Sequence, residues 1–430
     1  MSAFTVCAAA LLLERRLTGD PREGERHNLR GLFTINAVHV GRKGETYMIC
    51  AEVFRKIDEL NDTYLDVWEK TCAIESPTNN KAGVDAVGRF FAGMAEERGW
   101  TVEYSRQDVS GDVVCITMNP HVDAAPLCVS GHIDTVHPVG SFGETPVRRD
   151  AEKIYGPGVT DCKGGVVAGF YAMDVLWQCG YDKRPVRLLL QTDEEGSSMQ
   201  SGKSTIHYIC EKAKDAVAFL NLETHGAGKT CLTRKGVIAF RFHVEGRAGH
   251  SSRCVTEGAN AVIDAAYKMI ELDKLKDDDG ITCNCAIVSG GTVQNSIPGK
   301  CTFTVEFRYA NAEQYAWLRR YVEELAATEH VPGCSCTYEV ISERVSMEPN
   351  EKNLALLERA NKILEENGLP ELKAIKLRGG SDAADATAYG IPCLDSLGTR
   401  GGGSHTLREF AYLESLAEAA RRVAAIACGI

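Results

Sequence analysis

Histidine and carboxylate side chains follow several apolar, strand-like segments of this chain, at the points where those segments end. They are His132, Asp134, Asp161, Asp193, Glu194, Glu195, Glu223 and His405. Each alone has an ordinary explanation, because a carboxylate before a helix is commonly a cap and a histidine at a strand end is commonly structural. The three acidic residues after the apolar "VRLLLQT" are different, since they are costly to desolvate without a cation. All these groups fall at one predicted edge of a sheet, and together they predict a metal site.

The residue types in this group indicate which metals it would bind. The two imidazoles together with three of these carboxylates form a ligand set for borderline divalent metals, zinc above all, with cobalt and manganese as alternatives. Five ligands are too many for one open catalytic metal, so two metal ions that share one carboxylate are predicted as the cofactor. A water held between two cations ionises near neutral pH and becomes a nucleophile.

Two of the carboxylates have other predicted roles. Glu194 adjoins Glu195, and neighbouring residues project differently, so Glu195 can bind metal while Glu194 faces the water as a general base. Asp134 lies two residues after His132, close enough to hold the far nitrogen of that imidazole ring.

The segments around these residues alternate between strand and helix. Strands are predicted at 113–118, 125–131 and 186–192, and amphipathic or apolar helices at 84–99 and 164–180. This alternation is typical of an α/β layered domain with a mostly parallel sheet, in which sites lie at the carboxyl ends of the strands.

A second pattern begins near residue 233. The predicted order is strand, helix, two strands, helix and strand, a β-α-β-β-α-β unit of the ferredoxin-like kind. We therefore predict a catalytic domain of residues 46–232 and 343–430 that is interrupted by an inserted α+β domain, 233–342. Residues 1–45 are predicted to be a poorly ordered extension, with the first helix starting near Glu45.

Composition excludes several classes of protein. The net charge is −11 without any Lys/Arg-rich run, which argues against nucleic acid as a partner. No apolar run approaches the ~20 residues of a membrane span, and the short apolar run at 4–13 lacks the basic start of a signal peptide. The 17 cysteines include no C-x-x-C pair, which favours reduced thiols in a cytoplasmic protein.

Six motifs in this order resemble a known family. "GHIDTVHP", "GVTDCKGG", "TDEEGS", "NLETHG", "GRAGHSS" and "GGSDAADA…GGGSHTLRE" are similar to motifs of the co-catalytic zinc exopeptidases and amidohydrolases. That family includes glutamate carboxypeptidase, aminoacylase, succinyl-diaminopimelate desuccinylase and peptidase T, and the resemblance is strongest to the glutamate carboxypeptidase-like branch. It extends from about Glu45 to the C-terminus, and it implies a catalytic domain split by a smaller lid or dimerisation domain.

The resemblance implies a role for each candidate residue. Asp161 would bridge two metals, with His132 and Glu223 completing one position and Glu195 and His405 the other. Glu194 would be the general base and then the proton donor to the leaving amine, and Asp134 would orient His132. The peptide bond between Asp161 and Cys162 would be cis. Cys162 stands where many members have methionine or aspartate, so sensitivity to oxidation or heavy metals is expected.

The inserted domain would contribute to substrate binding. His250 resembles the family histidine that reaches the substrate carbonyl, often in the partner subunit's site, and a strand-end cap is its alternative role. Asn295 and Arg308 resemble contacts to the substrate carboxylate, although Arg308 fits a solvated rim equally well. Arg378 and Gly380 are further candidates for lining the pocket. A homodimer through the inserted domain is expected.

The predicted activity is hydrolysis of an amide bond, releasing a C-terminal amino acid or an N-acyl group from an amino acid. A di- or tripeptidase of the same family is the first alternative, and a non-catalytic binding relative is the second. An acyltransferase or racemase on the same fold also remains open. Glutamate carboxypeptidases have a basic "RGR"-like segment where this chain reads "ISERVSME", with only Arg344, so the resemblance does not fix glutamate as the substrate.

Overall fold

The computed structural model describes the backbone of residues 30–277 and 280–430, and the side chains of residues 51–277 and 280–430. The chain divides into two compact units, Met1–Tyr47 and Met48–Ile430. The part of the predicted extension that precedes Arg30 lies outside the described residues. Helix α2 (Arg30–Ala73) begins well before Glu45, where the sequence pattern predicted its start. A helix can continue beyond its apolar face because each added residue contributes one backbone hydrogen bond, and such a continuation leaves no apolar period in the sequence.

The larger unit contains a six-stranded sheet in the order β1-β2-β6-β3-β7-β16. Strands β6, β3, β7 and β16 run parallel, whereas β2 pairs antiparallel with β6 and β1 antiparallel with β2. The strands are β1 (Thr101–Ser105), β2 (Val113–Met118), β3 (Leu127–His132), β6 (Val186–Gln191), β7 (Ala218–Asn221) and β16 (Cys393–Leu394). Every residue of β3 and β7 is buried, as expected for parallel strands covered on both faces.

Helices cover both faces of this sheet. The larger core packs residues of α2, α3, α4, α8 and α10 against one face, and the smaller core packs α5 and α9 against the other. These helices are α3 (Lys81–Glu96), α4 (Lys163–Gln178), α5 (Ser204–Ala213), α8 (Glu351–Glu366), α9 (Asp382–Ala388) and α10 (Glu414–Gly429). The α/β class predicted from the sequence is therefore confirmed. Among the described helices, none combines the length and the apolar character that crossing a bilayer requires.

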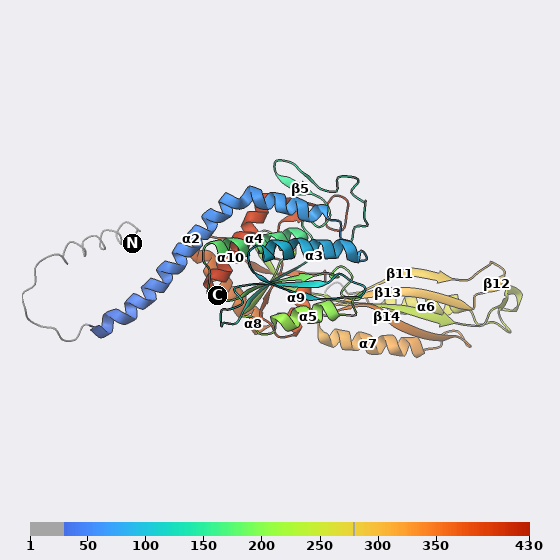
Figure 1. Cartoon of the computed structure of the whole chain (residues 1–430). Helices are drawn as coiled ribbons and strands as arrows, with labels where there is room; N and C mark the ends of the chain where they lie inside the picture. The colour runs from blue at the N-terminus through green and yellow to red at the C-terminus, as the bar shows by residue number, and fades with distance from the viewer. Residues whose placement is uncertain (1–29, 278–279) are drawn as a thin grey trace, which may run out of the picture. The chain divides into compact units, whose positions relative to one another are not determined.

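A second sheet has four antiparallel strands in the order β11-β13-β9-β14 (Figure 1). Its elements follow the chain as β9 (Gly236–Glu245), α6 (Ala261–Asp273), β11 (Thr282–Gly290), β13 (Lys300–Tyr309), α7 (Ala312–Ala327) and β14 (Ser335–Arg344). This is the predicted β-α-β-β-α-β order, with the strand arrangement of a ferredoxin-like unit. Its own core contains Phe242 stacked on Phe303, with ring centroids 4.6 Å apart.

The two segments that connect these sheets run side by side. The backbone N–H of Arg234 donates to the carbonyl of Met347, and the N–H of Met347 donates back to the carbonyl of Arg234, both at 3.0 Å. The remaining short elements are β4 (Arg148–Arg149), β5 (Lys153–Tyr155), β8 (Lys229–Arg234), β10 (Gly249–His250), η1 (Ser251–Arg253), β12 (Ser296–Ile297), β15 (Lys373–Leu377), β17 (Gly401–Gly402) and β18 (Phe410–Tyr412).

Candidate metal centre

Five predicted ligands meet at the carboxyl edge of the parallel strands. His132 is the last residue of β3, Glu195 lies in the turn after β6, and Glu223 follows β7. Asp161 precedes α4, and His405 lies in the loop between β17 and β18, with a backbone φ of 63°. The peptide bond between Asp161 and Cys162 is cis, as the resemblance implied. The fold thus brings together residues that lie far apart in the sequence.

Asp161 stands between the two imidazole rings. Its Oδ1 lies 3.2 Å from Nε2 of His132, and its Oδ2 lies 3.4 Å from Nε2 of His405. His132 Nε2 also faces Oε1 of Glu223 at 3.7 Å, and His405 Nε2 faces Oε2 of Glu195 at 3.1 Å. Each oxygen of one carboxylate is therefore paired with a different histidine and a different terminal carboxylate.

Burial and charge in this cluster leave strongly shifted pKa values. Burial raises the pKa of Glu195 to about 7 and holds the pKa of Glu223 well above its usual range. Hydrogen bonds to Asp161 and Glu195 raise the pKa of His405 to about 10. Burial acts to raise the pKa of Asp161 as well, but its hydrogen bonds to His132 and His405 outweigh that effect and lower it.

The environment of His132 leaves one ring nitrogen available. His132 Nδ1 lies 3.0 Å from the main-chain carbonyl of Asp134 and 3.5 Å from the carboxylate of that residue. A proton on Nδ1 that is donated to the carbonyl leaves the lone pair of Nε2 directed at Asp161 and Glu223. The nearer contact of His132 is thus to the backbone of Asp134, whereas the sequence pointed to its side chain.

The Asp134 carboxylate instead holds the turn that bears the two glutamates. Its Oδ1 accepts the N–H of Glu194 at 3.1 Å, and its Oδ2 accepts the N–H of Glu195 at 3.2 Å and the hydroxyl of Thr78 at 2.7 Å. Asp134 is completely buried, so these hydrogen bonds compensate its desolvation. The third acidic residue, Asp193, binds the Thr205 hydroxyl and the Ser201 N–H.

Arg344 contacts the candidate general base, a contact that the sequence did not reveal. Its guanidinium forms an ion pair with the Glu194 carboxylate and donates to the Glu194 carbonyl at 2.7 Å. It also lies 3.6 Å from the carboxylate of Asp382, whose pKa burial raises to about 8. Only 3% of the Arg344 side chain is exposed, so this is a buried cation shared by two carboxylates.

Glu409 supports the loop that carries Asp161, and it too was missed in the sequence. Its Oε1 accepts the N–H groups of Thr160 and Asp161 at 3.0 and 3.2 Å, and its Oε2 accepts the N–H of Gly158 at 3.1 Å. Nε2 of His137 also lies 3.1 Å from the same carboxylate. Glu409 sits in "TLREF" close to His405, so its position in the last motif was the only available signal.

Replacing Glu409 with glutamine is expected to destabilise the fold. The amide nitrogen would face N–H donors in place of an acceptor, and we expect the free energy of unfolding of the metal-free protein to fall by about 3 kcal/mol. Urea unfolding followed by circular dichroism measures this change. The control is Glu414→Gln, whose side chain is 70% exposed beside Arg400. Equal stability of Glu409→Gln and wild type would contradict the role of Glu409 in holding the loop.

A cavity of about 470 Å³ opens beside the cluster. Its wall combines the metal-site carboxylates with Arg308 and Gly380. Arg308 donates to the carbonyl of Arg378 at 2.7 Å and pairs with Glu306 at 3.0 Å. The predicted contacts Arg308 and Gly380 therefore line the cavity directly, whereas the exposed Arg378 holds Arg308 through its backbone.

His250 and Asn295 occupy a different place. Both are exposed, and the N–H of Ser251 donates to the carbonyl of Asn295 at 3.0 Å. His250 pairs with Ser296 in the short β10–β12 ladder, and its ring contacts the Ser252 hydroxyl at 2.8 Å. Neither residue lines the cavity that Arg308 and Gly380 line. His250 and Asn295 therefore lie beside each other, but not in the wall of that cavity.

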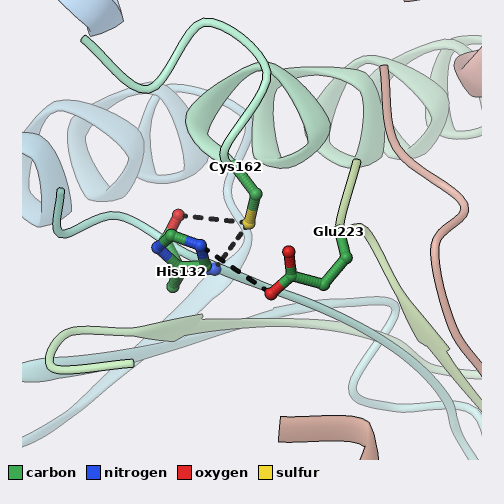
Figure 2. Close-up of side chains that lie close together, drawn as sticks. All are labelled: His132, Cys162 and Glu223. Carbon is green, nitrogen blue, oxygen red and sulfur yellow. Dashed lines mark hydrogen bonds and ion pairs between the residues drawn. The ribbon is translucent and has the colours of Figure 1, made fainter. Parts of the chain in front are cut away.

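The donor set fits divalent metal ions. The side chain of Glu223 is largely buried, with 12% exposed, yet its contact with His132, at 3.7 Å, exceeds hydrogen-bond distance. A buried carboxylate needs a cation or hydrogen-bond donors. His132, Asp161 and Glu195 offer ligand atoms that all lie within 4.8 Å of one another, and so do His132, Cys162 and Glu223 (Figure 2).

Comparison with known proteins agrees with this chemistry. Residues 128–428 match the family described as "Peptidase family M20/M25/M40". The chain belongs to this family. Members of the M20 family are metal-dependent hydrolases of peptide and amide bonds, and this chain is an enzyme of that kind.

Individual M20 proteins show how far the similarity extends. Carboxypeptidase G2 of Pseudomonas sp. (strain RS-16) is 28% identical over 360 residues, covering 82% of this chain and 86% of its own. Succinyl-diaminopimelate desuccinylase of Rickettsia canadensis (strain McKiel) is 26% identical over 216 residues, covering 46% of this chain and 56% of its own. The M20 metallo-carboxypeptidase Sso-CP2 of Sulfolobus solfataricus superposes with a TM-score of 0.67 at 16% identity, covering 85% and 98%.

Proposed function

We propose that this chain releases a C-terminal amino acid, or an N-acyl group, from a small substrate with a free carboxylate, using two metal ions bridged by Asp161. One observation carries this proposal: the two oxygens of Asp161 face two different imidazoles, 3.2 and 3.4 Å away. One metal position consists of His132 and Glu223, and the other of His405 and Glu195. Zinc is the proposed metal because imidazole and carboxylate ligands suit it, with cobalt or manganese as alternatives.

The protein groups around the cluster have distinct roles in the proposed reaction. When bound, the metal ions would supply Lewis-acid activation of water and of the scissile carbonyl. Glu194 takes the proton from the attacking water and later gives it to the leaving nitrogen. Arg344 fixes the carboxylate of Glu194 through the ion pair, and Asp134 fixes its backbone. Asp134 also fixes the tautomer of His132 through its main-chain carbonyl.

The cavity supports the choice of substrate. Arg308 lines the cavity with the metal-site carboxylates, so its guanidinium is placed to bind a substrate carboxylate while an adjacent amide reaches the cluster. The backbone of Gly380 lies in the same wall, and the carbonyl of Arg378 keeps Arg308 in place. The names of carboxypeptidase G2 and the desuccinylase describe the two substrate classes that we propose.

We further propose that the chain acts as a homodimer through the ferredoxin-like domain, residues 233–342. Apolar side chains are exposed on two adjacent elements of this domain, Ile263, Tyr267 and Ile270 on α6, and Ile287 and Val288 on β11. Strand β11 is also an edge of its sheet. In such a dimer, His250 and Asn295 would reach the partner's cavity, where His250 would stabilise the developing oxyanion. A cytoplasmic location is proposed because the described cysteines are free thiols.

The proposal is tested with three groups of substrates in the presence of zinc, cobalt or manganese. They are N-acyl amino acids, peptides with a blocked N-terminus, and dipeptides or tripeptides with a free N-terminus. We expect hydrolysis in the first or second group, and an increase in KM of about tenfold or more when the substrate carboxylate is amidated, because a charged hydrogen bond is lost. Hydrolysis confined to the third group would replace this assignment with a di- or tripeptidase. No hydrolysis by the metal-loaded protein would favour a binding protein.

A further inference from the structure

Cys162 lies at the metal centre but has no part in the chemistry described so far. It is completely buried, and it is the residue between Asp161 and the first residue of α4. Figure 2 shows its sulfur beside the imidazole of His132 and across from the carboxylate of Glu223. The ligand atoms of these three residues all lie within 4.8 Å of one another.

We propose that Cys162 is a further metal ligand and binds through its thiolate together with His132 and Glu223. Two atoms bonded to one zinc ion at about 2.0–2.3 Å lie no more than about 4.5 Å apart, so binding requires side-chain shifts on the order of 1 Å or less. As the sulfur–metal bond forms, the thiol proton leaves to solvent. This inference rests on the proposed two-metal function and specifies the composition of one of its positions.

The backbone around the sulfur is arranged to support a thiolate. The N–H of His132 donates to Sγ of Cys162 at 3.1 Å. The sulfur also lies at the N-terminal end of the sixteen-residue helix α4, where backbone N–H groups favour negative charge. Without a metal, the thiol can instead donate to the carbonyl of His132, 3.5 Å away.

Two glycines allow the helix end to approach the strands this closely. A Cβ on Gly131 would lie 2.8 Å from Cγ2 of Val166 and 3.3 Å from Sγ of Cys162. A Cβ on Gly165 would lie 2.0 Å from the carbonyl oxygen of Leu222, the residue before Glu223. Larger residues at either position would push the start of α4 away from His132 or Glu223.

A thiolate ligand makes the two metal positions unequal. The first would have four protein ligands, His132, Glu223, Asp161 and Cys162, which is the number found in closed zinc sites. The second would have three, His405, Glu195 and the shared Asp161, which leaves room for water and substrate. Because thiolates prefer zinc and cadmium to manganese, the first position should retain zinc in the presence of excess manganese.

X-ray absorption at the zinc edge tests the inference on the full-length protein, loaded with one and then with two equivalents of zinc. We expect a sulfur shell at about 2.3 Å in wild type that is absent in Cys162→Ser. We also expect Cys162→Ser to bind its tighter zinc at least about 100-fold more weakly, since even partners outside the ligand shell change affinity 10–100-fold. Cys254→Ser, at an exposed cysteine, is the matched control and should behave as wild type.

The outcomes separate this inference from the proposed function. Wild-type protein that binds two zinc ions with nitrogen and oxygen neighbours alone, and that hydrolyses amides, would overturn the role of Cys162 and leave the function standing. Failure of wild type to bind zinc would overturn both. If Cys162→Ser does not fold, as judged by circular dichroism, the wild-type spectrum still decides, because the sulfur shell is either present or absent there.

Discussion

Replacing Glu194 with glutamine is expected to lower kcat by about 10²–10⁴-fold, the usual contribution of a general base, while the metal content stays the same. Glutamine keeps the size of the side chain and can still accept a hydrogen bond from Arg344. It cannot accept the proton of the attacking water. Because Glu194 is not among the proposed metal ligands, the protein should retain both metal ions. Steady-state kinetics and elemental analysis of the same preparation measure the two quantities together.

A matched control separates the loss of the base from a general change of charge. Glu339→Gln removes one carboxylate from the surface of β14, where it pairs with Arg241 with about half of each side chain exposed. This variant should keep wild-type kcat, since exposed ion pairs contribute little. If Glu194→Gln retained wild-type turnover, Glu194 would not be the base. If it lost metal along with activity, Glu194 would belong to the metal site itself.

The fold was largely predictable because its elements have strong local patterns. The buried strands β3 and β6 are rich in apolar residues, and α3 shows apolar residues at helical spacing. The β-α-β-β-α-β order of the second sheet was predictable for the same reason. The start of α2 was not, because the backbone continues as a helix beyond the region where an apolar period marks it. A local pattern also cannot show that β2 runs antiparallel to the other strands of this sheet.

Most residues of the candidate site were predictable because they follow the ends of predicted strands. His132, Asp161, Glu195, Glu223 and His405 were all identified from that position, and the structure gathers them. Glu409 and Arg344 were missed as supporting residues, because their partners are distant in the sequence and neither follows a strand that points to the site. Arg344 lies 150 residues from Glu194, and Glu409 lies 251 residues from Gly158. Long-range contacts of this kind leave no periodic signal.

Replacing Asp161 with asparagine is expected to disrupt both metal positions at once. Asparagine keeps one oxygen but presents an amide nitrogen in place of the other, so one of the two histidines loses its shared ligand. The loss of charge weakens the remaining position as well, because the Asp161 carboxylate contacts both imidazoles. We expect the affinity for the second metal to fall at least about 100-fold. Glu223→Gln and Glu195→Gln should each weaken mainly one position.

The most direct test of the account is to count the metal ions bound per chain, by equilibrium dialysis against buffered zinc followed by elemental analysis. Wild type is expected to bind two zinc ions, and Asp161→Asn is expected to bind no more than one at the same free zinc concentration. Asp150→Asn, which changes an exposed aspartate outside the cluster, should bind two. One zinc ion per wild-type chain, or two in Asp161→Asn with unchanged affinity, would contradict the bridged pair of metals.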